Sequence, residues 1–289
     1  MKNTNFVKSR VVYPHGYNMK LRHTIVVFAL LIATGLRAQD FEVAPVILEF
    51  DAEPSTNQMK IVNVKNHSNK PMSYIVSLSD FLPNQHGGHQ SLPANTTKNS
   101  CANWITVNPS FFEVAPGGDI ALQVSMLVPS DEYKTAWCTI YLQPSREQTA
   151  WSVDRQTATG IVVSGRIGVN VYQAPKSMGT YAVRVSNLQE VFSNEPNAPR
   201  RFSAVLENTG DRIANCKLFL MLSRLDAMAE GGNDERIDID QMAVFPQMSR
   251  IVEFTLPEGM ASGIYSLALL ADYGARFPLE GAQVKVTVK

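Results

Sequence analysis

The stretch Phe111-Phe112-Glu113-Val114-Ala115-Pro116-Gly117-Gly118-Asp119-Ile120-Ala121-Leu122-Gln123-Val124 has the residue pattern of a strand, a Pro-Gly turn and a second strand. Ile120, Leu122 and Val124 alternate with small or polar neighbours, and Pro-Gly is a frequent turn dipeptide. Alternation with a period of two residues is typical of an antiparallel sheet that buries one face. The segment therefore predicts β-structure.

The same alternation recurs along the first half of the chain. Further runs with strand character are Phe41–Phe50, Gln58–Asn66, Met72–Ser79, Trp104–Val107, Ala136–Leu142 and Gly160–Gln173. Short strands with no helical stretch between them are typical of an immunoglobulin-like β-sandwich. Two long polar segments, Leu82–Ser100 and Gln143–Thr159, interrupt the strands and are expected to be loops that are either functional or disordered.

A second set of strands follows a break at Ala174–Gly179, which has the composition of a linker. Its runs are Tyr181–Ser186, Phe202–Leu206, Lys217–Leu222, Ile251–Leu256, Ile264–Ala271 and Val284–Val288. We therefore expect an all-β protein with two immunoglobulin-like β-sandwich domains, residues 39–174 and 175–289, after an N-terminal extension and signal peptide in residues 1–38. Val244-Phe245-Pro246 faintly repeats Val114-Ala115-Pro116, which either a related design of the two sandwiches or the general preference for Pro at turns explains.

The N-terminal segment has the layout of a secretory signal peptide. Basic residues follow Met19, an apolar run extends from Ile25 to Ala33, and small residues end at Ala38, after which we expect cleavage. The alternative is a membrane anchor, but the apolar run is about half of the ~20 residues that a spanning helix needs. We expect a periplasmic protein with no membrane span once the signal is removed, and Met19 is a candidate start codon.

The charge balance of the exported chain does not favour nucleic acid as a partner. Without residues 1–38 the chain keeps 20 basic and 26 acidic residues, a formal net charge of −6. Nucleic-acid-binding domains instead carry a strongly basic surface.

No residue pattern indicates an enzyme. The sequence has no Gly-x-Ser-x-Gly elbow, His-Glu-x-x-His motif or phosphate-binding loop. His86 and His89, with His67 or Asp80 as a third ligand, are a weak candidate metal site, and a solvated loop is the simpler interpretation. Acidic residues at 234, 238 and 240 resemble a calcium cluster but lack the EF-hand spacing. We expect no metal and no cofactor.

Three cysteines allow at most one intramolecular disulfide bond. Cys101 and Cys138 are a tentative pair in an oxidising compartment, and two separate buried thiols are the alternative. Cys216 is expected to be inert. Trp151 lies in a polar segment and is either a partner-contact residue or part of local packing.

Residues Trp104–Pro144 resemble the first domain of the PapD-like periplasmic pilus (fimbrial) chaperones. The similarity consists of a hydrophobic strand, a Pro, a Pro-Gly turn between two strands, an acidic stretch and an aromatic strand that ends near a Pro. Here these features are Ile105, Val107, Pro109, Phe112, Val114, Pro116-Gly117, Asp131-Glu132, Trp137, Ile140, Leu142 and Pro144. The similarity covers roughly the first domain, and the second domain is similar only in size and strand content.

The resemblance implies a chaperone-like protein that binds exported subunits by β-strand augmentation. The strand implied is Gly160–Tyr172, in which one face carries Ile161, Val163, Ile167, Val169 and Val171. In the family a basic pair binds the carboxylate of the client; here Arg166 is the candidate, while Phe41–Phe50 contains no Arg or Lys. An ordinary last strand of a sandwich is the alternative interpretation of the segment. For the whole protein the alternative is a non-enzymatic structural component of a cell-envelope or secretion assembly.

Overall fold

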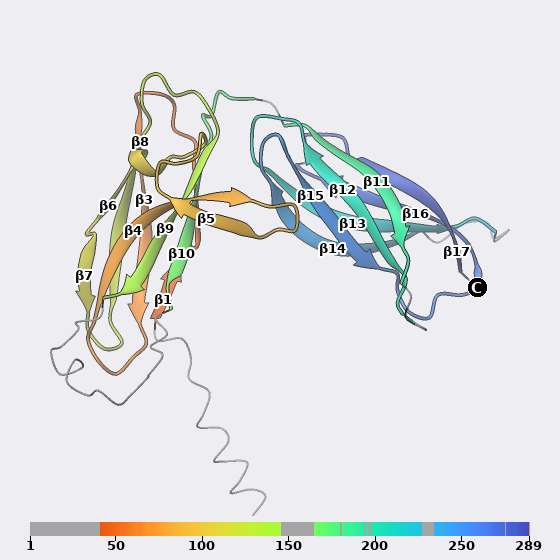
Figure 1. Ribbon diagram of the computed structural model, residues 1–289, viewed down its shortest axis with the longest axis horizontal. Coiled ribbons are helices and arrows are strands. Elements are labelled where there is room, and N and C mark those ends of the chain that lie inside the picture. Colours follow the sequence, from red (N-terminus) through yellow and green to blue (C-terminus); the bar gives the residue numbers. More distant parts are fainter. Residues whose placement is uncertain are drawn as a thin grey trace, which may run out of the picture. The chain divides into compact units, whose positions relative to one another are not determined.

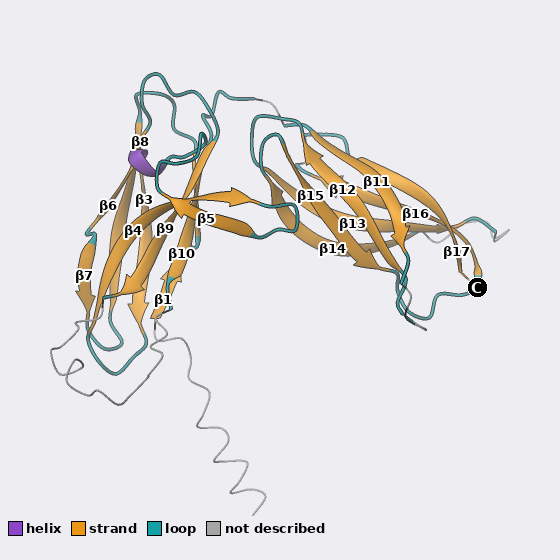
Figure 2. Cartoon of the chain, in the orientation of Figure 1, coloured by secondary structure: helices purple, strands orange, loops and turns teal. Residues whose placement is uncertain are grey.

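The computed structural model describes residues 41–145, 165–179, 181–193, 195, 198–226, 234–274 and 276–288 (Figures 1 and 2). Residues 41–289 form one compact unit. The described residues are almost entirely strands and connecting loops, with one short 3-10 turn at Ala102–Trp104. The predicted all-β class with two β-sandwiches is confirmed.

The first sandwich has two sheets. The four-stranded sheet has the order β1-β3-β8-β6, with bounds β1 Phe41–Ala44, β3 Asn57–Asn66, β8 Asp119–Leu127 and β6 Ile105–Asn108. The opposite sheet has the order β2-β10-β9-β4-β5, with β7 also paired to β4; the bounds are β2 Ile47–Phe50, β10 Ile167–Gln173, β9 Ala136–Pro144, β4 Met72–Pro83, β5 His89–Pro93 and β7 Phe111–Val114. Neighbouring strands are antiparallel except for β2 and β10, which run parallel.

The segment that predicted the fold connects the two sheets. β7 pairs with β4, whereas β8 pairs with β3 and β6, so the two strands flanking the Pro-Gly turn lie in opposite sheets. Gly117 has a positive φ of 67° there, a conformation that glycine adopts without steric cost. Phe112, Val114, Leu122 and Val124 all point into the core between the sheets and are at most 6% exposed. The alternation in the sequence therefore arises because the two strands bury their inner faces against each other in the core.

Aromatic rings fill one end of the first core. The ring of Tyr74 lies 5.5 Å from that of Phe112 and 5.1 Å from that of Phe41, between centroids. Fully burying side chains of this size stabilises a fold by about 1.5–3 kcal/mol each. These contacts join β1, β4 and β7, and so tie the two sheets together.

The second sandwich has a three-stranded and a four-stranded sheet. The order of the first is β11-β12-β15, with bounds β11 Val183–Val191, β12 Arg201–Asn208 and β15 Met248–Thr255. The order of the second is β14-β13-β16-β17, with bounds β14 Glu235–Val244, β13 Ala214–Arg224, β16 Gly263–Asp272 and β17 Glu280–Val288. Its core is rich in leucines, among them Leu206, Leu218, Leu220, Leu267 and Leu269. The domain boundary that we expect between residues 174 and 175 lies directly after β10. It stays a prediction.

Candidate functional site

The chain changes sheets between β1 and β2. β1 pairs with β3 in the four-stranded sheet, whereas β2 pairs with β10 in the opposite sheet. Pro45 and Val46 alone separate the two strands along the chain. The pairing of β2 begins where Ile47 lies opposite Asn170, so β2 covers the edge of β10 from Asn170 onward.

The N-terminal part of β10 is paired on one side. Residues Ile167–Val169 pair with β9, and no strand among the described residues lies along their other edge. The N–H of Asn170 donates to the carbonyl oxygen of Val46 at 2.9 Å, which places the main-chain groups of Asn170 on the β2 side. Alternate residues of a strand point their main-chain groups to the same side, so the N–H and C=O of Gly168 also point there. We call this side of Ile167–Val169, which no strand among the described residues pairs with, the open edge.

The side chains of β10 divide between core and surface. Val169 and Val171 are 0% exposed and belong to the core of the first sandwich, and Ile167 is partly buried against the same core. The structure therefore corrects the expectation that Val169 and Val171 contact a partner with their side chains. Their packing agrees with the alternative interpretation, an ordinary last strand, for this part of the segment.

The remaining predicted contact residues precede the described part of β10. Ile161, Val163 and Trp151 lie outside the described residues, so their contact with a partner stays a prediction.

Arg166 stands immediately before the open edge. It is exposed, and its guanidinium carbon lies 3.8 Å from the centroid of the Tyr141 ring on β9. A guanidinium stacked on an aromatic ring keeps its charge and its N–H donors while its position is restricted. Its binding of a carboxylate stays a prediction, and the geometry leaves the group accessible for it.

The sequence did not predict the basic residues near the other end of β10. A hollow of about 710 Å³ is lined by Tyr172 of β10, Lys60 of β3, and Arg212 and Arg276 of the second sandwich. Arg212 is already engaged, because it donates to the carbonyl oxygens of Pro175 and Met178 at 2.6 and 2.8 Å. No local motif joins residues so far apart in the sequence, so only the fold reveals this group.

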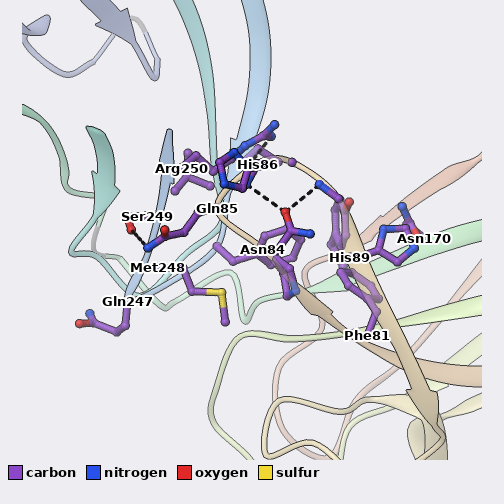
Figure 3. A pocket seen from close by; sticks show the side chains of 17 residues that line it. Phe81, Asn84, Gln85, His86, His89, Asn170, Gln247, Met248, Ser249 and Arg250 are labelled. Carbon is purple, nitrogen blue, oxygen red and sulfur yellow. Dashed lines mark hydrogen bonds between the residues drawn. The ribbon is translucent and has the colours of Figure 1, made fainter. Parts of the chain in front are cut away.

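A second cavity lies beside the hairpin formed by β4 and β5 (Figure 3). Its volume is about 690 Å³, and its lining includes Phe81, His86, His89, Phe245 and Arg250. The rings of Phe81 and Phe245 are 5.7 Å apart in an edge-to-face arrangement at the base of the hairpin. The expected long loop at Leu82–Ser100 is thus corrected in part, because β5 occupies its middle.

The tip of this hairpin is held by a side-chain amide. The Oδ1 atom of Asn84 accepts from the N–H groups of His86 at 2.9 Å and Gly88 at 3.0 Å (Figure 3). Asn commonly stabilises turns in this way. Gly87 has φ 88° and packs against Arg250, such that a Cβ atom there would lie 2.1 Å from a guanidinium nitrogen. Glycine adopts this positive φ without the strain that another residue would meet there.

The hairpin tip also bonds to β15. The N–H of Ile251 donates to the carbonyl oxygen of Gln85 at 2.8 Å. In addition, Nε2 of Gln85 donates to Oγ of Ser249 at 3.3 Å (Figure 3). These contacts are hydrogen bonds of the main chain and of a side-chain amide. They attach the tip of the hairpin to β15 beside the cavity.

The candidate third ligands for a histidine metal site are engaged elsewhere. Both carboxylate oxygens of the buried Asp80 accept hydrogen bonds, one from Oγ of Ser100 at 2.6 Å and the other from the N–H groups of Thr96 and Thr97. His67 lies 2.9 Å from Glu42. In the part of the chain that the structure describes, no group of three or more His, Cys, Asp or Glu is arranged to hold a metal ion.

The acidic residues of β14 belong to a strand surface. Asp238 forms an ion pair with Arg236 at 3.0 Å and is largely exposed, and Asp240 is also exposed. Alternation with Ile237 and Ile239 accounts for their positions without a bound calcium ion.

Cys101 and Cys138 are close neighbours in the first core. Their sulfur atoms are 3.3 Å apart, and both residues are free thiols with 0% exposure. Burial raises the pKa of the Cys101 thiol well above its usual range, as does its neighbour Cys138. Burial also raises the pKa of Cys216, to about 12, which agrees with an unreactive thiol. The disulfide bond stays a prediction, and the two sulfur atoms are already 3.3 Å apart.

Comparisons with known proteins find similar structures that are fimbrial chaperones. The class 5 fimbriae chaperone CfaA is 12% identical, with a TM-score of 0.44 over 86% of this chain and 99% of that chain. The Pseudomonas aeruginosa chaperone CupB2 is 12% identical, with a TM-score of 0.42 over 86% and 100%. A Salmonella enterica structure of the SafA pilin in complex with the SafB chaperone matches at 10% identity and a TM-score of 0.42, over 88% and 99%.

No protein-family model and no curated protein matches the chain. With identities of 10–12% and TM-scores below 0.5, we base the function on the geometry of β10 and not on these similarities. Among the described residues no helix is both long and apolar enough to cross a membrane.

Proposed function

We propose that this protein binds exported protein subunits by pairing its open edge with a strand of the partner. The observation that supports this function most is that β2 covers β10 from Asn170 onward, whereas the main-chain groups of Gly168 have no partner among the described residues. A free strand edge recognises another strand through main-chain hydrogen bonds, largely independently of sequence. The function is binding and not catalysis.

The partner we propose is a subunit whose own sandwich lacks a strand. Such a subunit has an apolar groove and two unpaired edges, which make it prone to aggregation. Val169 and Val171 are committed to the core of the first sandwich, so the side chains that enter the groove come from the part of the segment before Ile167. Ile161 and Val163 have the required spacing of two residues.

Arg166 supplies the charge in this proposal. Its exposed guanidinium lies on the Tyr141 ring next to the open edge, where it binds the terminal carboxylate of the partner. The location is the periplasm, reached through the N-terminal signal with cleavage after Ala38.

Two substitutions of Arg166 distinguish the contribution of its main-chain N–H to binding from the contribution of its charge. Arg166→Ala removes the guanidinium and keeps the main-chain N–H. If the chain is extended at this position, that N–H points to the same side as the N–H of Gly168, which is the open edge. Arg166→Pro removes both groups. The measurement is the amount of exported protein that co-purifies with each variant, with Leu127→Ala, an exposed residue on β8 in the opposite sheet, as control.

We expect Arg166→Pro to lose most of the bound partner, and Arg166→Ala to lose a part of it, about tenfold in affinity. Full binding by Arg166→Pro, with unchanged thermal stability, contradicts strand pairing at this edge. Equal losses in the two variants assign the effect to the charge alone. A bound partner that never exchanges with an added competitor favours the structural component of an envelope assembly over a chaperone.

A further inference from the structure

Aromatic rings gather at one end of the cavity beside the β4–β5 hairpin. The rings of Phe81 and Tyr172 lie 5.7 and 5.6 Å from that of Phe245, each in an edge-to-face arrangement. The imidazole of His89 lies 5.1 Å from the ring of Phe81. Walls of this kind bind planar apolar groups, and the volume of about 690 Å³ is in the range of small-molecule sites.

Arg250 lines the cavity at a distance from these rings. In Figure 3 Arg250 and Phe81 lie at opposite ends of the residues drawn. The guanidinium is held in place, because Nη1 donates to the carbonyl oxygen of Ala243 at 3.3 Å and the group packs against Gly87. A guanidinium that is already fixed binds an anion at a low entropic cost.

The charge of Arg250 has no counterion among the described residues. Four other arginines of the second sandwich form ion pairs with carboxylates, namely Arg200, Arg201, Arg224 and Arg236. Arg250 forms no such pair in the described part of the chain, and its buried Nε atom has no hydrogen-bond partner there. No Asp or Glu is among the residues that line the cavity. A partly buried cation without a counterion is unfavourable, and a bound anion relieves this cost.

We propose that this cavity binds a small aromatic carboxylate, with its ring against the aromatic walls and its carboxylate on Arg250. An uncharged aromatic molecule leaves the guanidinium without a counterion, and a small inorganic anion leaves the walls without a contact. A cation is not favoured, because the groups on the lining that can carry charge, Arg250, His86 and His89, are basic. The site is separate from the open edge, since neither Arg166 nor Ile167–Val169 lines the cavity.

Isothermal titration calorimetry with 3-phenylpropanoate tests the proposal. A probe of this size should bind with a dissociation constant of about 100 μM. Neutral 3-phenylpropanamide and acetate should each bind at least tenfold more weakly, because each lacks one of the two groups that the cavity recognises. Acetyl-Gly-Gly-Phe carries the same ring and carboxylate at the end of a peptide. Tighter binding of this peptide than of the free acid overturns the assignment to a small molecule.

Substitution of Arg250 tests the role of its charge. Arg250→Gln should weaken the binding of 3-phenylpropanoate at least tenfold and leave the weak binding of the amide unchanged. Arg276→Gln is the matched control, because it makes the same change at an exposed arginine that does not line the cavity. This control should leave the dissociation constant unchanged. Binding by Arg250→Gln as tight as that of the parent protein overturns the proposal.

Imidazole resonances in NMR spectra locate the site without a substitution. His86 and His89 line the cavity, whereas His67 lies 2.9 Å from Glu42 and is not part of the lining. The probe should shift the signals of His86 and His89 and leave that of His67 in place. Equal shifts of all three, or no binding up to about 5 mM probe, overturn the proposal. Neither result affects the test of Arg166, which lies outside the cavity lining.

Discussion

Asn66 and Asn208 occupy equivalent positions in the two sandwiches and make the same hydrogen bonds. Each buried amide donates to the main-chain oxygen four residues further on, at 2.8 and 2.7 Å respectively. Each also donates to a valine carbonyl oxygen, that of Val114 at 3.0 Å and that of Val244 at 2.8 Å. These valines begin the two Val-x-Pro segments of the faint sequence repeat, so the repeat reflects a related design of the two sandwiches.

Substitution of either asparagine should destabilise its sandwich. Asn66→Ala leaves the carbonyl oxygen of Val114 buried without its donor, for an expected loss of about 2–3 kcal/mol, and Asn208→Ala should have a similar effect. Asn63→Ala on the exposed face of the same strand is the control and should cost less than about 0.5 kcal/mol. Urea unfolding followed by circular dichroism measures these differences, and equal stability of Asn66→Ala and Asn63→Ala would contradict the assignment.

The buried part of β10 should respond as a core strand. Val171→Ala removes two methyl groups from a fully buried side chain and should lower the free energy of unfolding by about 2 kcal/mol. Val46→Ala makes the same chemical change at a site that is 52% exposed, and should lower it by less than about 0.5 kcal/mol. If chemical denaturation shows equal losses for the two variants, Val171 is not a core residue as described.

Oxidation should join Cys101 to Cys138. When oxidised glutathione is present during refolding, while both thiols are still accessible, it takes two electrons and two protons from them, so that the disulfide bond forms and two molecules of reduced glutathione are produced. The bond closes a loop between residues 37 apart, for which chain entropy predicts about 4 kcal/mol of stabilisation.

Thiol counting after denaturation measures this step. The oxidised protein should show one reactive thiol, that of Cys216, and the reduced protein three. Cys138→Ser is the control and should show two thiols under both conditions. Three reactive thiols in the parent protein after oxidation would refute the pairing.

The charge of Asp80 should contribute to stability above acidic pH. Burial opposes that charge, but hydrogen bonds from Ser100, Thr97 and Thr96 outweigh it and hold the pKa below the ordinary value of 3.8. The stabilisation is therefore present above the unfolded pKa and is lost as the pH falls through the lower folded pKa.

Replacement of this carboxylate tests the pH dependence. Asp80→Asn should lose about 2–3 kcal/mol at pH 7, because the amide offers one acceptor in place of two. The difference from the parent protein should shrink as the pH falls below about 4. Unfolding midpoints from pH 2 to 7 provide the measurement, with the exposed Asp119→Asn as control. A difference that does not change with pH would show that the charge is not the cause.

The sequence predicted the strands because burial between two sheets imposes a simple alternation. Ile120, Leu122 and Val124 show that pattern, and their positions in β8 follow it. In β10 the alternation distinguished the two faces of the strand, but it did not show which face packs against the core. That depends on β2 and β9, which are more than 20 residues away along the chain, and it decides that Val169 and Val171 are buried.

Other features of the site depend on contacts between distant residues, and such contacts produce no recognisable pattern in the local sequence. Asp80 lies close to His86 and His89 in the sequence, yet its carboxylate binds the loop before Cys101. Residues on different sandwiches, such as Lys60 and Arg276, share a hollow without sharing a motif.

The parallel pairing of β2 with β10 has a consequence for how the protein itself folds. Ile47 must meet Asn170, so the first sandwich cannot close until the chain as far as β10 has been delivered. Contacts between residues so distant in sequence form late and slowly, because the loop entropy is lost before they stabilise the fold. Until then the chain is a sandwich without its last strand, with Val169 and Val171 outside their core. While it folds, the protein thus passes through the same incomplete state in which we propose that it binds others.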